Sequence, residues 1–254
     1  MISRRPTFQI LDETEELLVL SKAPGVMVHP TRPSDERTML HDIRELLAYE
    51  IAAGATPGII NRLDRETSGL VLIAKNSQAS RRCGMAMQER KVRKSYLAIA
   101  CGVPGEERFV VDEPILRLSE TKDFAGEIWL KRGVHPEGQH ARTEFRVLQQ
   151  WEDERGGAMC LLRCHPITGR THQIRVHLSW YGLPVLGDKL YGPSDKLYLE
   201  FIRTGWTDRL DAELQHPRHA LHSSELSIDF DGQKYFWKCP LAEDLQGWLP
   251  GSLT

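Results

Sequence analysis

The sequence predicts an α+β fold, with a largely antiparallel mixed sheet flanked by helices. Strand-like and helix-like segments are interspersed, without the strict β-α-β alternation of a doubly wound parallel fold. The Asp231-Gly232 pair between two apolar runs is a typical turn of an antiparallel hairpin. The 254 residues are 41% hydrophobic and 27% charged, which is enough for a sizeable core. We find no internal repeat or linker, so we expect one domain over residues 1–254.

The first 101 residues predict six elements. Two short strands come first, and apolar residues spaced three and four apart then predict a helix that stops at Gly54. A compact apolar run of strand length follows, then a helix with Ser77 as its cap, and a strand that ends at Gly102. The segments are 8–11, 17–21, 38–53, 69–75, 77–90 and 91–101.

The second part of the chain begins with a stretch rich in glycine, proline and acidic residues, which predicts loops and short hairpins. Two alternating runs then predict strands, and a helix follows that Gly182 closes. A partly helical region, the hairpin at Asp231-Gly232 and a short helix complete the fold. The segments are 103–138, 141–150, 158–165, 171–181, 194–215, 221–229, 233–238 and 242–248.

Composition and charge exclude several classes of protein. No segment approaches the roughly 18 apolar residues of a membrane-spanning helix. The arginines near the N-terminus are not followed by an apolar stretch, so a secretory signal is not expected. The five scattered cysteines are typical of reduced thiols, and we expect a cytoplasmic protein. The net charge is −2, yet residues 81–96 hold six basic residues against one acid, which favours a basic face.

A metal or nucleotide cofactor is not expected. Cys160, Cys164 and His165 resemble a zinc ligand set, but residues four apart on a strand lie about 13 Å from each other. Two thiolates at that distance cannot share an ion. The sequence has no P-loop, no GxGxxG and no G-x-S-x-G motif.

Two polar segments are candidates for chemistry. The loop 60–69 places Asp64 immediately before an apolar strand, which would hold the carboxylate on a rigid edge. In it, Ser68-Gly69 predicts a tight turn. The segment 165–178 opens a helix on which His172 and Arg175 share a face. An arginine held in this way is a good partner for a carboxylate. Taken alone, the first pattern is most often a surface turn and the second most often an amphipathic helix, and no spacing shows that the two segments meet.

Taken together, these segments resemble the RluA-type pseudouridine synthases. NRLDRETSGL resembles that family's catalytic-aspartate motif, and KVRKSYLAIACG its next motif. PITGRTHQIRVHL followed by GLPVLGDKLYG resembles the third, while LLVLSKAPGVMVHP and HALHSSELSI resemble an early hairpin and a late strand. The matches run in order from about residue 15 to 240. The chain departs from the pattern at Asn61, where the family often has histidine, and we expect no N-terminal S4 module.

The resemblance implies a catalytic domain with a central cleft, which isomerises uridine to pseudouridine in a ribosomal or transfer RNA stem-loop. The base is flipped out of the stem, and no cofactor or metal is needed. Asp64 would be the essential carboxylate, although its point of attack, base or ribose, stays open. Tyr96 would pack on the target base, and Arg175 would pair with Asp64. We expect a monomer that does not associate with membranes.

Nine further residues are candidates for RNA contact. Arg62 resembles the arginine that fills the space of the flipped base, and the others are cationic side chains or a histidine that would bind the backbone. They are Arg62, Arg81, Arg82, Arg90, Lys91, Arg93, Lys94, Arg170 and His172.

Two alternatives come from other classes of protein. The first is a degenerate synthase that only binds RNA, although loss of Asp64 would be its signature and Asp64 is present. The second is a glycoside hydrolase that uses Asp64 with Glu66. Residues two apart in a loop seldom flank one bond, so the single-carboxylate interpretation fits better.

Overall fold

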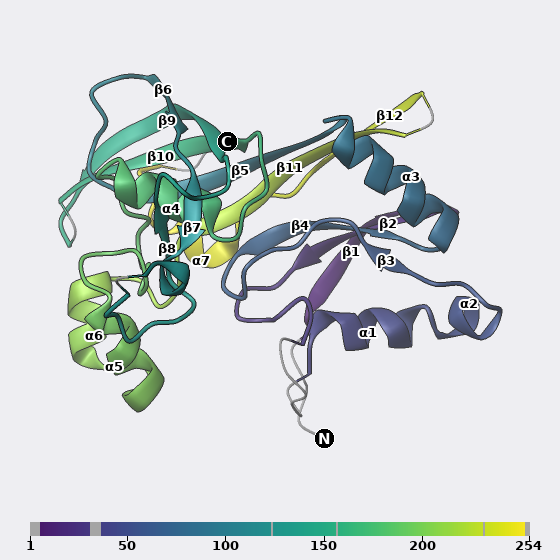
Figure 1. Ribbon diagram of the computed structural model, residues 1–254, viewed down its shortest axis with the longest axis horizontal. Coiled ribbons are helices and arrows are strands. Elements are labelled where there is room, and N and C mark those ends of the chain that lie inside the picture. Colours follow the sequence, from purple (N-terminus) through teal and green to yellow (C-terminus); the bar gives the residue numbers. More distant parts are fainter. Residues whose placement is uncertain (1–5, 31–36, 123, 156, 231, 252–254) are drawn as a thin grey trace. The chain divides into compact units, whose positions relative to one another are not determined.

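The computed structural model describes residues 6–30, 37–122, 124–155, 157–230 and 232–251 (Figure 1). The chain forms two compact units, each built from two stretches of sequence. Unit 1 comprises residues 1–94 and 222–243, and unit 2 comprises residues 95–221 and 244–254. Both units mix helices with mostly antiparallel strands, which confirms the α+β class. The single domain and its central cleft stay predictions.

The sheet of unit 1 has β4 at its centre, and all seven residues of this strand are buried. Its strands follow the order β1-β2-β4-β11, with β3 also paired to β4 and β12 paired to β11. All pairs are antiparallel except β4 with β11, which is parallel. The bounds are β1 Phe8–Glu13, β2 Leu17–Lys22, β3 Gly58–Ile59, β4 Ser68–Ala74, β11 Leu221–Phe230 and β12 Gln233–Lys238. The predicted hairpin is present, although Asp231 lies outside the described residues.

The helices of unit 1 correct two expectations. They are α1 Met39–Leu46, α2 Ala48–Ala52 and α3 Ser77–Gln88. The single helix predicted over 38–53 is wrong, because the buried residue Leu47, which lies between α1 and α2 in the sequence, leaves helical geometry. The cap of α3 is Asn76 and not Ser77, since the Asn76 side chain accepts a hydrogen bond from the Ala79 N–H at 2.8 Å.

Unit 2 contains an antiparallel sheet in the order β5-β10-β9-β6. A second, two-stranded sheet of β7 and β8 lies in the stretch expected to form loops and hairpins. The bounds are β5 Val92–Cys101, β6 Arg108–Asp112, β7 Ile115–Arg117, β8 Arg132–Val134, β9 Arg142–Asp153 and β10 Gly157–Pro166, with a 3-10 turn at Leu118–Glu120.

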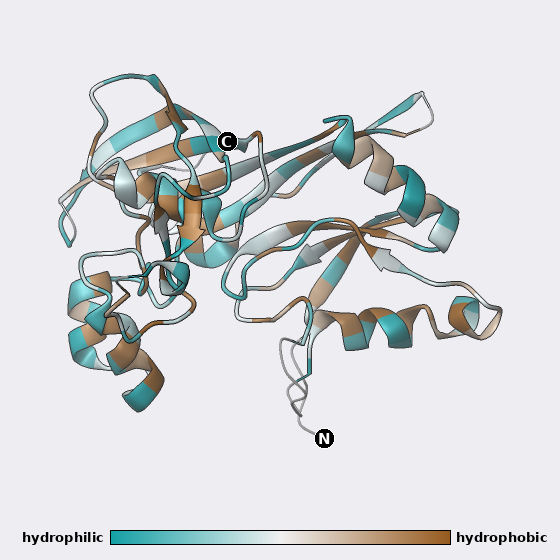
Figure 2. Ribbon diagram, viewed as in Figure 1, coloured by the Kyte–Doolittle hydropathy of each residue, from teal (hydrophilic) through white to brown (hydrophobic). Residues whose placement is uncertain are grey.

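The other α-helices of the described residues are α4 Gln173–Trp180, α5 Lys196–Thr204, α6 Asp208–Leu214 and α7 Glu243–Gln246. Apolar and polar residues alternate along α5 and α6 (Figure 2), whose apolar faces meet through Leu197, Leu210 and Leu214. Helix α4 is different, because every residue from Gln173 to Leu178 is buried. It is therefore a core helix and not the amphipathic surface helix that the sequence also allowed. Over the described residues, no helix has the length and apolar character to cross a membrane.

Candidate active site

The loop that carries Asp64 connects β3 to β4 in unit 1. Its tight turn spans Asp64 to Thr67, whose N–H donates to the Asp64 carbonyl at 3.1 Å. The turn predicted at Ser68-Gly69 is wrong, because both residues lie inside β4. Gly69 is needed there for another reason. It has φ +103°, and a Cβ at this position would lie 2.2 Å from the Ser223 carbonyl oxygen of β11. The half-buried Asp64 side chain thus sits just before a rigid, fully buried strand.

A buried lysine ties this loop to the end of β2. Lys22 is 1% exposed, and its ammonium donates to the carbonyls of Ala23 at 2.7 Å, Val26 at 2.9 Å and Arg65 at 2.9 Å. In return, Arg65 Nε donates to the Gly25 carbonyl at 3.0 Å. The early motif and the aspartate motif therefore meet in space, and the backbone next to Asp64 has little freedom.

A serine–histidine pair anchors the other end of the loop. Ser68 Oγ lies 2.9 Å from His222 Nδ1, and His222 Nε2 lies 3.3 Å from the Cys239 carbonyl oxygen. A carbonyl only accepts, so His222 Nε2 donates to Cys239. Both side chains are buried, so this pair fixes the start of β4 against β11.

Most cationic residues predicted to bind RNA in unit 1 lie on its surface. Arg62 is exposed near His29, whose pKa is lowered by burial and by the Arg62 charge. The exposed members are Arg62, Arg81, Arg90, Lys91 and Arg93. Arg82 and Lys94 are only partly exposed. Arg82 pairs with Glu16 and stacks on Phe230 at 4.6 Å, and burial lowers the pKa of Lys94.

In unit 2, the side chain of Arg175 forms a buried two-point ion pair with Asp188. Arg175 Nε donates to Asp188 Oδ2 at 2.7 Å, and Nη2 donates to Oδ1 at 2.8 Å. Asp188 Oδ1 also accepts from the N–H groups of Leu190 and Tyr191, both at 3.0 Å. Burial alone would raise the pKa of Asp188, but the Arg175 charge and hydrogen bonds hold it well below its usual range. Asp188 therefore fixes the plane of the Arg175 guanidinium.

Tyr191 contacts both candidate residues of the segment 165–178, His172 and Arg175. Its ring lies 4.9 Å from the Arg175 guanidinium carbon, and its hydroxyl lies 2.8 Å from His172 Nδ1. The same hydroxyl accepts from the Arg132 N–H at 3.1 Å. The prediction that His172 lies on the helix is wrong, because it precedes α4 in a left-handed conformation with φ 59°. His172 and Arg175 nevertheless contact one side chain.

The segment before Asp188 packs along β5, the strand that carries Tyr96. Leu186 N–H donates to the Ile99 carbonyl at 2.9 Å. Gly187 has φ +74°, and a Cβ on it would lie 2.1 Å from the Arg218 carbonyl oxygen, so only glycine lets the chain pass here. Tyr96 is 7% exposed and opposite Cys164 of β10. Sequence reasoning missed Asp188 and Tyr191 as partners of Arg175, although both lie in the GLPVLGDKLYG motif.

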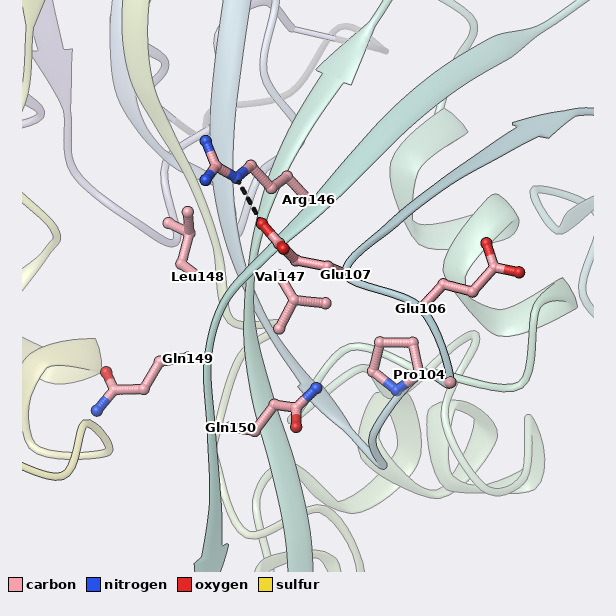
Figure 3. Close-up of a pocket in the computed structure, with 9 residues that line it drawn as sticks. Pro104, Glu106, Glu107, Arg146, Val147, Leu148, Gln149 and Gln150 are labelled. Carbon is pink, nitrogen blue, oxygen red and sulfur yellow. Dashed lines mark hydrogen bonds and ion pairs between the residues drawn. The ribbon is translucent and has the colours of Figure 1, made fainter.

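An open groove elsewhere in unit 2 contains none of the predicted site residues. It is lined by residues 104–107 and 146–150, and Arg146 donates to Glu107 across it at 3.3 Å (Figure 3). Arg170 is exposed and donates to the His140 carbonyl at 3.0 Å. The groove is therefore separate from the motif residues, and we assign it no function.

Within the described residues, no group of three or more histidine, cysteine, aspartate or glutamate side chains is arranged to hold a metal ion. Burial raises the pKa of the Cys160 thiol to about 12 and that of Cys164 well above its usual range. Both cysteines are core residues.

Comparison with known proteins identifies the family. A model of the family described as RNA pseudouridylate synthase matches residues 16–180, which include all the motif positions from Asp64 to Arg175. The chain belongs to this family. The pairing of Asp64 with Arg175 and the stacking role of Tyr96 stay predictions.

The matches to relatives and to solved structures of the family cover nearly the whole chain. The ribosomal large subunit pseudouridine synthase D of Nitrosomonas europaea is 33% identical over 243 residues, which are 95% of this chain and 64% of that protein. The protein of the same name from Yersinia pestis is 35% identical and covers 93% of this chain and 68% of its own length. The chain thus spans about two thirds of these relatives. The structure of human RNA Pseudouridylate Synthase Domain Containing 1 has a TM-score of 0.72, 25% identity and coverage of 97% and 91% of the two chains.

Proposed function

We propose that the protein isomerises uridine to pseudouridine in RNA, with Asp64 as the essential carboxylate. The observation that carries the proposal is the braced Asp64 loop, within a chain of the pseudouridylate synthase family. The reaction detaches uracil from its ribose, turns it and rejoins it through carbon 5. No atom is gained or lost, so the chemistry requires a positioned carboxylate and proton transfer, and no cofactor or metal.

Asp64 has the environment that such a role requires. Its backbone is held by the Thr67 N–H and, one residue on, by Lys22, so the side chain starts from a fixed position. Fixing a reacting group in advance removes entropy cost from the reaction step. A uridine in a stem must be flipped out to reach it, and exposed Arg62, two residues before Asp64, would occupy the space left behind.

Arg175 and Tyr96 serve the same reaction in this proposal. Asp188 accepts from two nitrogens of the Arg175 guanidinium and holds its plane in place. Arg175 would keep Asp64 ionised and oriented as the site closes over a base. Tyr96 would pack on the uracil ring, as aromatic side chains do in RNA recognition.

We propose ribosomal large-subunit RNA as the substrate, and not transfer RNA. The support is that the named relatives are ribosomal large subunit pseudouridine synthases. Incubation of unmodified large-subunit RNA and of unmodified transfer RNA with the protein, followed by pseudouridine quantification, tests this choice. Pseudouridine in transfer RNA alone would contradict it. A cytoplasmic location and a monomeric state stay predictions.

Arg90→Ala is expected to weaken RNA binding without changing turnover at saturating RNA. Arg90 is exposed just after α3, in a left-handed conformation with φ 56°. Arginine and alanine both carry a Cβ, so the substitution adds no new backbone strain. Loss of one phosphate contact flattens the dependence of log affinity on log salt by about one unit. The measurement is a salt titration of binding. Arg203→Ala, an exposed position on α5, is the control and should leave the slope unchanged. Equal slopes for Arg90→Ala and the wild type would remove Arg90 from the RNA surface.

Chelators are expected to leave both the melting temperature and the activity unchanged. The two thiols closest to a zinc pattern, Cys160 and Cys164, are neutral and buried, whereas zinc binds thiolates. The assay uses a short RNA hairpin, because magnesium also folds larger RNA. Loss of activity in EDTA that zinc or magnesium restores on this hairpin would show that a metal takes part.

A further inference from the structure

Asn61 stands where the resemblance leads one to expect histidine, three residues before Asp64. It is 4% exposed and lies at the point where the β3–β4 ladder ends. Gly58 and Ile59 pair with Ala74 and Ile73, and the Ile60 N–H donates to the Leu72 carbonyl at 2.9 Å. After Ile60 the main chain leaves the ladder to form the Asp64 loop.

The side chain of Asn61 continues the ladder where the main chain departs. Its Oδ1 accepts from the Leu72 N–H at 2.8 Å, and its Nδ2 donates to the Leu70 carbonyl at 3.1 Å. Leu70 and Leu72 are both 0% exposed, so water cannot replace either bond. The amide closes the loop 62–67 at its neck.

The partners fix the orientation of this amide. A backbone N–H only donates and a carbonyl only accepts, so oxygen must face Leu72 and nitrogen must face Leu70. The two backbone partners thus require one acceptor and one donor at the end of the same side chain. An amide supplies both at every pH, since it does not titrate.

We propose that Asn61 is a positioning residue that clamps the neck of the Asp64 loop and so holds the carboxylate in its reacting place. The clamp acts together with the Lys22 bond to Arg65 and with the Asp64–Thr67 turn, and it closes the loop just after β3. This inference rests on the proposed role of Asp64.

The variant Asn61→Asp tests whether Asn61 acts through its two hydrogen bonds or only by filling space. Aspartate has nearly the same shape as asparagine, so the packing is kept and only the hydrogen bonding changes with pH. When protonated, its carboxyl accepts from Leu72 and donates to Leu70, which reproduces both bonds. When ionised, it places a charged oxygen against the Leu70 carbonyl and has no proton to donate. Burial favours the neutral acid, so the introduced carboxyl is expected to ionise at a pH well above the usual pKa range of aspartate.

Turnover of Asn61→Asp relative to the wild type is therefore expected to be near one at pH 5.5 and to fall at least about tenfold by pH 8.5. RNA affinity should stay within about twofold at both values, because the Asn61 side chain is buried and bonds only to the backbone of β4 in this account. The measurement is single-turnover pseudouridine formation across this range, well below the melting temperature.

Asn76→Asp is the matched control in the same unit. The Asn76 side chain caps α3 by accepting alone, from the Ala79 N–H at 2.8 Å, and a carboxylate accepts equally well. Its turnover ratio should not change with pH. A flat ratio for Asn61→Asp would overturn the inference, and so would a failure of this variant to fold at pH 5.5, where both bonds are restored.

A failure of the proposed function gives a different result. If the wild type forms no pseudouridine, that function is wrong, and melting temperatures then test the clamp. The melting temperature of Asn61→Asp relative to the wild type should fall as pH rises, whereas that of Asn76→Asp should not. Parallel melting profiles for the two variants would reject the clamp.

Discussion

Asp64→Asn is expected to lower the rate of pseudouridine formation by at least about a thousandfold. The amide is nearly isosteric with the carboxylate but cannot act as a nucleophile or carry the negative charge. The backbone bond from the Thr67 N–H to the Asp64 carbonyl does not involve the side chain, so the turn should survive. RNA affinity should stay within a few fold.

The measurement is single-turnover pseudouridine formation, with folding checked by circular dichroism. Asp64→Ala is assayed beside it, because slow deamidation of asparagine would restore aspartate. Activity above a few per cent of wild type in either folded variant would remove Asp64 from the chemistry. A wild type that binds RNA as tightly as Asp64→Asn, with neither of them active, would instead favour the degenerate RNA-binding alternative.

Asp188→Asn is expected to destabilise the fold by about 3–5 kcal/mol, because it removes the buried negative charge that Asp188 places against Arg175. Asp188 is 0% exposed and Arg175 is 6% exposed, so water cannot take over. The measurement is urea unfolding at pH 7. Glu107→Gln is the control, since Glu107 pairs with Arg146 at 3.3 Å on the surface and such pairs contribute at most about 1 kcal/mol.

The pH dependence of the unfolding free energy tests whether the loss in Asp188→Asn comes from the ion pair. The pKa of Asp188 is lower in the folded protein than in the unfolded chain, so its ion pair contributes fully above about pH 4. That contribution disappears as pH falls from there through the folded-state pKa. The gap in unfolding free energy between the wild type and Asp188→Asn should therefore shrink below about pH 4. A constant gap, or a loss no larger than that of Glu107→Gln, would show that the pair contributes little.

The fold class and most strands follow from local sequence, because alternation and turn residues are local signals. Gly69–Lys75 was predicted as a buried strand, and β4 is entirely buried. The break at Leu47 was not predictable, since the apolar spacing continues through it and only packing selects which leucine is buried. The cap at Asn76 was missed because Asn76 and Ser77 are both good caps and adjacent.

The site was predictable in its motifs and not in its supporting contacts. Asp64 and Arg175 are recognised from short patterns around them. Their partners are distant in sequence: Lys22 binds the Arg65 carbonyl across 43 residues, and Asp188 binds Arg175 across 13 residues. A buried charge next to Gly187 in an apolar stretch was the available signal, because an acid in such a place requires a cation.

Tritium release tests the central claim most directly. Large-subunit RNA transcribed with uridine tritiated at carbon 5 loses that tritium to water when carbon 5 becomes the point of attachment to ribose. We predict release that levels off at a fixed amount per RNA molecule, without free uracil, and no release with Asp64→Asn. Free uracil would indicate a glycoside hydrolase. An absence of release from both ribosomal and transfer RNA, with folded wild-type protein, would contradict the assignment of pseudouridine synthase activity.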